Sequence, residues 1–268
     1  MTNPDKYVVI TGGSKGLGYE FAKLYAREQF NLILVARDEK ELTKAAKELE
    51  ENHGIHCHTF AYDLSDMGEI DKFHKVTKEK NLEVAILINN AGFGYWGKFD
   101  KMDPAMQIEM LNLNITGLSH LTRLFVNDMI KSGSGKILNV SSIASFTPTP
   151  FCATYAASKT YVKYFSQALD YELRDKNISV STLCSPDFLS GFQKRAGNPN
   201  LIPKGPYVGT AEGVAKVAFK QFMKNKRVIT PYSLFGLITC YLENHVPMPD
   251  GIKINIRKWI VEKEYMAK

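Results

Sequence analysis

Apolar, β-branched runs alternate with helix-like segments along the whole chain, and this alternation restricts the fold more than any other feature. The runs are KYVVIT (6–11), NLILVA (31–36), IHCHTFA (55–61), VAILIN (84–89), KILNVS (136–141), ISVSTLC (178–184) and RVIT (227–230). The early runs are almost continuously apolar, as in strands that are buried on both faces. Strands that alternate with helices form a parallel sheet covered on both sides. We therefore expect an α/β fold with a doubly wound, mostly parallel seven-stranded sheet.

The alternation continues without an internal repeat, a low-complexity tract or a Pro/Ser-rich linker. A chain of 268 residues is also long enough to bury a sizeable core. We expect one domain over residues 1–268, in which 193–268 form a divergent substrate-side and C-terminal region.

Composition and charge argue against several classes of protein. The net charge is +6, but Lys and Arg are scattered, so no nucleic-acid partner is expected. The four cysteines lie far apart without a CxxC pair or a histidine spacing suited to zinc, which predicts no metal site and a reducing compartment. The first strand begins too early for a signal peptide, and YSLFGLITCYL (232–242) is about half the length of a membrane-spanning helix. We expect a cytoplasmic protein without a spanning segment.

A glycine-rich loop, TGGSKGLG (11–18), follows the first strand and opens a helix. Its spacing is TGxxxGxG rather than GxGxxG, with Gly12, Gly16 and Gly18 at the fixed positions and Gly13 in addition. Glycines let the backbone approach a pyrophosphate, and the helix N-terminus stabilises its negative charge. The loop predicts a dinucleotide site in a Rossmann-type sheet, although a plain strand-to-helix turn would carry the same glycines.

The second strand ends in an arginine where an acidic residue would bind the adenosine ribose of NAD. Asp38 can instead cap the next helix, with Glu41 completing a capping box. The planar fork of Arg37 suits a 2′-phosphate, and Lys15 can add a second positive charge. We expect NADP(H) to be preferred over NAD(H), the alternative being that Arg37 is a solvated loop residue.

Four further motifs follow: NNAG (89–92), LNLNITG (111–117), NVSSIAS (139–145) and YAASK (155–159). In this order and spacing, over about residues 5 to 192, the set resembles the short-chain dehydrogenase/reductase family in its single-domain form. The resemblance implies hydride transfer between a nicotinamide and a carbonyl or secondary alcohol carbon. It implies catalytic roles for Asn114, Ser142, Tyr155 and Lys159. It implies cofactor contacts from Gly12, Ser14, Lys15, Gly16, Leu17, Gly18, Arg37, Asp63, Leu64, Asn89, Ala91, Gly92, Tyr155, Lys159 and Pro186.

The residue types suit this chemistry. Tyr155 and Lys159 are four apart on a predicted helix and share a face, so the ammonium should lower the pKa of the phenol. Ser142 would leave the carboxyl end of the fifth strand, where doubly wound sheets bind ligands. The spacing to Tyr155 favours Ser142 over its neighbour Ser141. By the resemblance, Asn114 rather than Asn112 supports a proton relay through water.

Two positions leave alternatives open. In CSPDFLSGF (184–192), Pro186 matches the family, but Asp187 replaces the usual glycine and Ser190 is the nearest substitute for its threonine. Asp187 either lies near the nicotinamide or points to solvent. Asp63 either contacts the adenine or caps the next helix.

The C-terminal third, RVITPYSLFGLITCYLENHVPMPDGIKINIRKW (227–259), resembles a DltE-like branch, with some likeness to hydroxysteroid and long-chain ketoacyl reductases. Aromatic residues near the expected pocket suggest an apolar carbonyl or alcohol substrate; they are Phe93, Tyr95, Trp96, Phe151 and Phe188. Two alternatives are an NADP(H)-binding sensor without turnover and an acyl-thioester ketoreductase. Members of the family commonly pair through helices here at 105–131 and 153–176, so the resemblance implies a homodimer or homotetramer.

Overall fold

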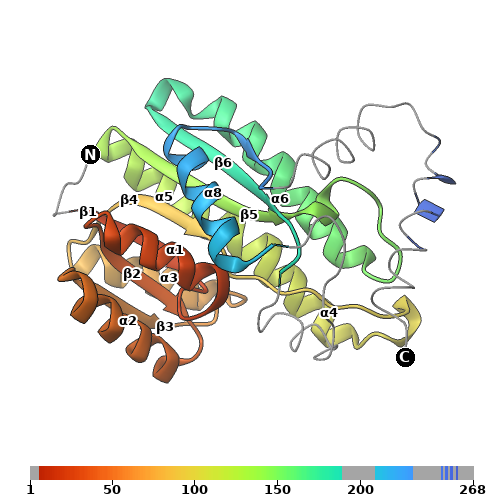
Figure 1. Cartoon of the computed structure of the whole chain (residues 1–268), viewed down its shortest axis with the longest axis horizontal. Coiled ribbons are helices and arrows are strands. Elements are labelled where there is room, and N and C mark those ends of the chain that lie inside the picture. The colour runs from red at the N-terminus through yellow and green to blue at the C-terminus, as the bar shows by residue number, and fades with distance from the viewer. Residues whose placement is uncertain are drawn as a thin grey trace.

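Seven parallel strands form a single twisted sheet, as the sequence predicts (Figure 1). The computed structural model describes residues 6–188 and 209–231 and six positions further on: 249, 251, 252, 254, 255 and 258. The strands are β1 (Lys6–Thr11), β2 (Asn31–Ala36), β3 (Cys57–Ala61), β4 (Glu83–Asn89), β5 (Gly135–Ser142), β6 (Ile178–Ser185) and β7 (Val228–Ile229). They lie in the order β3-β2-β1-β4-β5-β6-β7. The chain therefore winds outward from β1 in one direction and from β4 in the other.

Helices cover both faces of the sheet (Figure 1). One face carries α1 (Gly16–Arg27), α2 (Glu39–His53) and α8 (Ala211–Met223); the other carries α3 (Met67–Glu79), α4 (Pro104–Leu111), α5 (Leu118–Ser132) and α6 (Ala153–Glu172). Shorter turns are η1 (Phe99–Lys101), η3 (Ile143–Ser145) and η4 (Arg174–Lys176), and a π-helical segment, η2 (Asn112–Gly117), joins α4 to α5.

The sheet has a hydrophobic core on each of its faces, because successive side chains of a strand point to opposite faces. In β1, Val8 and Ile10 pack against α1, α2 and α8, while Val9 between them packs on the opposite side. All three side chains are fully buried. This explains why the sequence of β1 is apolar at consecutive positions rather than alternating with polar residues.

Local signals set the ends of α2 and α3. Asp38 is the N-cap of α2 and accepts a hydrogen bond from the backbone N–H of Glu41 (3.1 Å), and Gly54 ends the helix at φ +68°. Asp66 caps α3 through the N–H groups of Gly68 (2.7 Å) and Glu69 (3.2 Å). The alternative that Asp63 caps this helix is therefore wrong.

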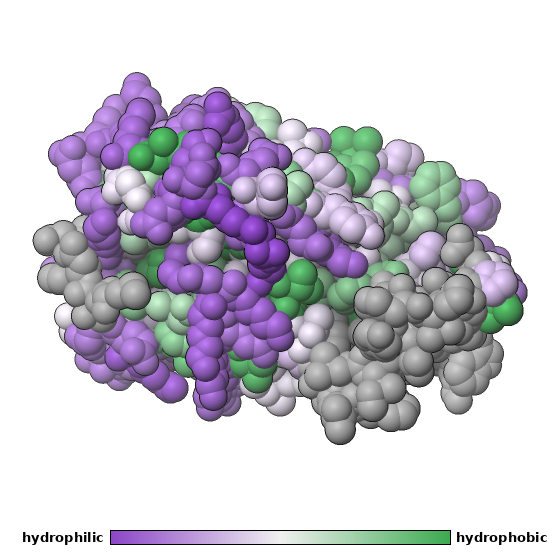
Figure 2. All heavy atoms as spheres, turned by 90° about the horizontal axis from the view of Figure 1, so that it is seen from above, coloured by the Kyte–Doolittle hydropathy of each residue, from purple (hydrophilic) through white to green (hydrophobic). Residues whose placement is uncertain are grey.

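The surface of the described segments is of mixed character. Figure 2 shows one face, on which hydrophilic side chains dominate one half and more hydrophobic ones gather toward the other. Among the described residues, none of the helices combines the length and apolar character needed to cross a bilayer. Within the same ranges, no cluster of three or more His, Cys, Asp or Glu side chains could hold a metal ion. The apolar stretch 232–242 lies outside the described residues.

The strand order creates a crevice where the two halves of the sheet diverge. β1 pairs with β2 on one side and β4 on the other, and the chain leaves both β1 and β4 at the same edge. In doubly wound sheets, ligands bind at this topological switch point, outside the carboxyl ends of the strands. The glycine loop and the NNAG motif meet there.

Candidate active site

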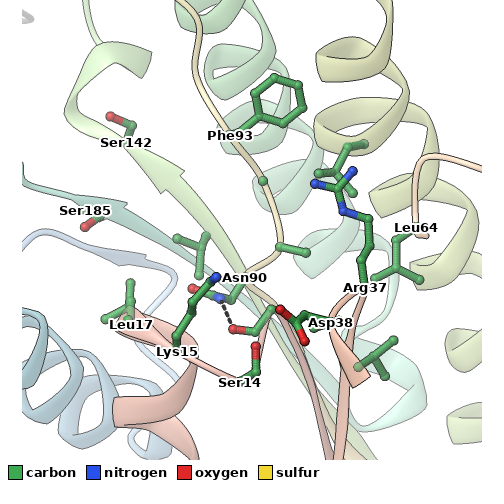
Figure 3. A pocket seen from close by; sticks show the side chains of 18 of the residues that line it. Ser14, Lys15, Leu17, Arg37, Asp38, Leu64, Asn90, Phe93, Ser142 and Ser185 are labelled. Atoms are coloured by element: carbon green, nitrogen blue, oxygen red, sulfur yellow. Dashed lines mark hydrogen bonds between the residues drawn. The ribbon is translucent and has the colours of Figure 1, made fainter. Parts of the chain in front are cut away.

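A cavity of about 1100 Å³ lies along the carboxyl ends of the strands. Figure 3 shows Arg37 on one side of it and Ser142 on the other, with Ser14 and Lys15 between them. The lining includes most of the residues that the sequence predicted for cofactor and catalysis: Gly12, Ser14, Lys15, Gly16, Leu17, Arg37, Asp63, Leu64, Ala91, Gly92, Ser142, Tyr155, Lys159 and Pro186. Gly18, Asn89 and Asn114 do not line it. An elongated cavity of this size can hold a dinucleotide with a substrate beside it.

The glycine loop forms a backbone cradle at the floor of the cavity. Gly12 and Gly16 have φ values of +65° and +58°, which L side chains rarely adopt. A Cβ on Gly18 would lie 2.2 Å from the carbonyl oxygen of Gly12, so Gly18 allows α1 to pack directly on the loop. Lys15 is the N-cap of α1 and offers no acceptor, which leaves the first N–H groups of the helix without a side-chain cap. This arrangement fits a pyrophosphate.

Thr11 and Asn90 connect the glycine loop to the NNAG motif. The Thr11 hydroxyl accepts hydrogen bonds from the N–H groups of Asn90 and Ala91 (both 2.9 Å), and the Asn90 side chain donates to the Thr11 carbonyl (2.9 Å). Neither side chain was predicted to join the two loops, although Thr11 begins the glycine-rich motif and Asn90 lies within NNAG. Their effect is to hold two loops from neighbouring strands at one wall of the cavity.

Asn89 does not lie in the cavity wall, where the cofactor contact implied by the resemblance would place it. It is 3% exposed, and its amide donates to Thr122 (2.9 Å) and Asn139 (2.8 Å). Asn89 therefore ties β4 to α5 and β5 beneath the site instead of forming the cavity wall.

Ser142, Tyr155 and Lys159 meet at the other end of the cavity. Ser142 is the last residue of β5, and its side chain hydrogen-bonds the Tyr155 side chain. Lys159 is one turn beyond Tyr155 on α6; its Nζ lies 5.8 Å from the Tyr155 ring centroid and donates to the carbonyl of Val140 (3.0 Å). The register of α6 places Tyr155 and Lys159 one turn apart, and the packing of α6 against β5 brings Ser142 to Tyr155.

The pKa values of the pair are set by burial. Burial lowers the pKa of Lys159 to about 8. Burial also raises the pKa of Tyr155, and the negative charge of Asp187 adds to this, while the hydrogen bond with Ser142 acts in the opposite direction. The expectation that the ammonium lowers the pKa of Tyr155 is therefore wrong for this structure, because desolvation of the phenolate dominates.

Asn114 lies behind the cavity rather than in its wall. Its side chain donates to the carbonyl of Phe93 (2.9 Å) and to Ser158 (3.1 Å), and it accepts from the N–H of Phe93 (3.2 Å). It belongs to η2, and π-helical segments often occur at functional sites. The Asn114 side chain fixes the loop whose Gly92 lies against Lys159: a Cβ on Gly92 would come within 3.3 Å of the Lys159 Nζ.

Asp187 lines the cavity together with Ser185 and Pro186. Its charge acts on Tyr155, so the structure supports the hypothesis that this carboxylate lies at the catalytic end rather than the alternative that it points to solvent. Ser190, the other residue considered there, lies outside the described residues.

Arg37 lies in the wall at the opposite end and interacts with two carboxylates. Its Nη1 is 3.0 Å from Oε1 of Glu109 and 3.6 Å from Oδ2 of Asp63. Burial acts to raise the pKa of Asp63, but hydrogen bonds from Ser65 and the charge of Arg37 together keep it below its ordinary value. Two residues at this end were not predicted from the sequence: Glu109, which is 72 positions from Arg37, and Lys40, which lines the cavity.

The aromatic residues expected near the pocket divide into two groups. Phe93 and Phe188 line the cavity, and the ring of Trp96 packs at 5.2 Å from that of Tyr155. Tyr95 accepts a hydrogen bond from the N–H of Asp103 (3.3 Å), and Phe151 has a φ of +64°. Phe93, Phe188 and Trp96 therefore contribute an apolar surface next to the predicted catalytic residues.

Comparisons with known proteins agree with this geometry. A family model described as short chain dehydrogenase matches residues 6–200. The very-long-chain 3-oxoacyl-CoA reductase-A of Danio rerio is 32% identical over 88% of this chain and 74% of its own length. The very-long-chain 3-oxoacyl-CoA reductase of Anas platyrhynchos is 31% identical over 98% of this chain and 84% of its own length. These relatives give no support to the expected DltE-like branch.

Solved structures show the same fold. A short-chain dehydrogenase from Sphingobium yanoikuyae in complex with NADPH superimposes with a TM-score of 0.79 at 29% identity, covering 84% of this chain and 87% of that one. The bulky-bulky ketone specific alcohol dehydrogenase from Comamonas testosteroni gives 0.76 at 25% identity, covering 91% and 96%. The motifs, the cavity and these matches establish that the chain belongs to the short-chain dehydrogenase family of oxidoreductases, which bind a nicotinamide cofactor and act on carbonyl or alcohol groups.

Proposed function

We propose that this protein is an NADPH-dependent reductase of the 3-oxo group of an acyl thioester. The observation that carries the proposal is the elongated cavity with a phosphate cradle and Arg37 at one end and Ser142, Tyr155 and Lys159 at the other. The relatives named as 3-oxoacyl-CoA reductases support the substrate class. The intact catalytic group argues against a sensor without turnover.

The side chains at the catalytic end suit the proton chemistry of reduction. When bound, a nicotinamide cofactor supplies the hydride that adds to the carbonyl carbon. Tyr155 gives its hydroxyl proton to the carbonyl oxygen, so C=O becomes CH–OH. A raised pKa keeps Tyr155 protonated near neutral pH, which is the state that reduction requires. Ser142, which contacts Tyr155, orients the oxygen by a hydrogen bond.

Lys159 and Asn114 support these groups from behind. Lys159 is 5% exposed and one turn from Tyr155, so it can hold the ribose of the cofactor and help return a proton to the tyrosine. Asn114 uses its side chain to bind the Phe93 loop, so any relay through this residue would run by its backbone carbonyl.

The cofactor preference rests on positive charges at the adenosine end. Arg37, Lys15 and Lys40 line the cavity there. The arginine can donate two parallel hydrogen bonds to a 2′-phosphate, whereas the lysines act as point charges. NADPH in the complex of the Sphingobium relative is consistent with this preference.

A free ketone with two large substituents is the second candidate substrate. Phe93 and Phe188 line the cavity and Trp96 packs on Tyr155, which suits an apolar group on the reacting carbon. The similarity to an alcohol dehydrogenase named for bulky-bulky ketones favours this alternative.

We also propose that the whole chain is one domain and forms a homodimer or homotetramer through α6. The outer side of α6 exposes small and aromatic residues at intervals of three and four, which places them on one helical face: Ala153, Ala157, Tyr161, Tyr164, Ala168 and Tyr171. A continuous face of this kind suits packing against a second copy. Light scattering should give a multiple of the chain mass, and Tyr164→Glu should lower it.

The test of the proposed reaction is NADPH oxidation with a matched substrate panel. The panel contains 3-oxoacyl-CoA esters of increasing chain length, the corresponding free 3-oxo acids, and ketones with two bulky substituents. Tyr155→Phe should lower kcat by roughly 10²–10⁴-fold because the proton donor is lost, while Tyr164→Phe, an exposed tyrosine on the same helix, should leave it unchanged. Turnover of thioesters alone supports the proposal, and turnover of free ketones alone favours the second candidate. If NADPH binds but no substrate turns over, the enzymatic assignment is wrong.

A further inference from the structure

We infer that Glu109 competes with the cofactor's 2′-phosphate for Arg37 and so weakens the discrimination between NADPH and NADH. The inference rests on the proposed NADPH site and names a specificity-determining residue within it. Glu109 belongs to α4, far in sequence from the glycine loop and from the strand that ends at Arg37.

The contact geometry places Glu109 in direct competition. Arg37 reaches Oε1 of Glu109 with its Nη1 at 3.0 Å, and the same nitrogen is 3.6 Å from Asp63. The guanidinium lies in the cavity wall, where Figure 3 shows it near Leu64. A phosphate that binds Arg37 must therefore either displace Glu109 or lie close to its negative charge.

The local charge balance strengthens the competition. Three cationic residues line this end of the cavity, Lys15, Arg37 and Lys40, but so do the carboxylates of Asp38, Glu39 and Asp63. Glu109 adds a fourth negative charge on the arginine itself. A 2′-phosphate carries between one and two negative charges, so each neighbouring carboxylate opposes its binding. An arginine at this position is consequently weaker as a phosphate site than its sequence alone suggests.

Glu109 rather than Asp63 is the movable member of the pair. The Asp63 carboxylate is fixed within its own loop by the N–H (2.9 Å) and the hydroxyl (2.7 Å) of Ser65. Glu109 is the closer of the two to Arg37, and it reaches the arginine from another element, α4. Replacement by Gln keeps the length of the side chain and an oxygen that can accept from Arg37, so the variant removes only the charge.

The experiment compares ligands that differ in the 2′-phosphate. Dissociation constants of NADPH, NADH, adenosine 2′,5′-bisphosphate and AMP are measured by calorimetry for the wild type, Glu109→Gln and Arg37→Ala. Glu83→Gln is the matched control, because Glu83 is also ion-paired (Lys6 Nζ, 2.7 Å) but begins β4 at the opposite edge of the sheet. The nucleotide fragments need no turnover, so the result does not depend on identifying the substrate.

Glu109→Gln should tighten NADPH and adenosine 2′,5′-bisphosphate by about 3- to 10-fold, the range expected of a partly exposed charge at this distance. NADH and AMP should change by less than about twofold, and Glu83→Gln should change none of the four. Unchanged or weaker binding of the 2′-phosphorylated ligands to Glu109→Gln, together with a large loss in Arg37→Ala, would overturn the inference but leave the proposed cofactor site standing. If Arg37→Ala binds NADPH as well as the wild type does, the proposed site is wrong.

Discussion

Gly18→Ala tests whether the glycine loop is required for close backbone packing or only for flexibility. Gly18 is the third residue of α1, and an added Cβ would lie 2.2 Å from the Gly12 carbonyl oxygen and 2.8 Å from its carbon. Both contacts are with backbone, so no side-chain rotation relieves them. Gly68 provides a matched control in the first turn of α3, where the nearest atom to an added Cβ is the Asp66 Oδ1 at 3.2 Å.

The expected free energies follow from these distances. Alanine gains up to about 1 kcal/mol over glycine in a helix. Overpacking a core typically costs about 1–3 kcal/mol. We expect a cost of about 3 kcal/mol for Gly18→Ala, at the upper end of this range, because the backbone itself must move. Gly18→Ala should therefore lose about 2 kcal/mol of unfolding free energy, or roughly 4–8 °C in Tm for a chain of this size. Gly68→Ala should keep or slightly raise the Tm, because the Asp66 side chain can adjust.

The two variants should also differ in cofactor binding. Displacement of Gly12 moves the cradle, so Gly18→Ala should bind NADPH at least about 10-fold more weakly, which corresponds to about 1.4 kcal/mol. Thermal unfolding without cofactor and calorimetric titration with NADPH measure the two effects separately. Equal Tm values and affinities for Gly18→Ala and the wild type would refute the reasoning that Gly18 is required by the approach of α1 to the loop.

Three further predictions concern ionisation and capping. Because burial lowers the pKa of Lys159 to about 8, the unfolded chain binds more protons than the folded one between pH about 8 and about 10. The unfolding free energy of the wild type relative to Lys159→Met should therefore rise by about 3 kcal/mol over that range, as measured by urea titrations without cofactor. The same pH dependence of the unfolding free energy in both proteins would contradict this prediction. Burial and the charge of Asp187 both raise the pKa of Tyr155, so Asp187→Asn should shift the alkaline limb of the pH profile for ketone reduction to lower pH; superimposable profiles would exclude this coupling. Asp66→Ala should lower the unfolding free energy measured with denaturant by about 1 kcal/mol, because α3 loses its N-cap. An unchanged denaturation midpoint would show that this cap does not stabilise the protein.

The sequence by itself determined the parts of this protein that depend on near neighbours in the chain. β1 and β2 have the bounds expected from their apolar runs, and Asp38 caps α2 as its position suggests. Tyr155 and Lys159 come together because the spacing of four residues places them on one side of α6. Each of these features follows from a periodicity of two or 3.6 residues, or from a hydrogen bond within one turn.

Only the tertiary structure decided how segments distant in the sequence meet. The pairing of Arg37 with Glu109 joins the end of β2 to α4, and the hydrogen bonds of Asn114 place its side chain behind the cavity. The pKa of Tyr155 moved in the opposite direction to the local expectation, because burial sums the effects of many elements while the sequence displays only the nearby lysine. Contacts across the fold and desolvation depend on how whole elements pack, and no local pattern in the chain encodes that packing.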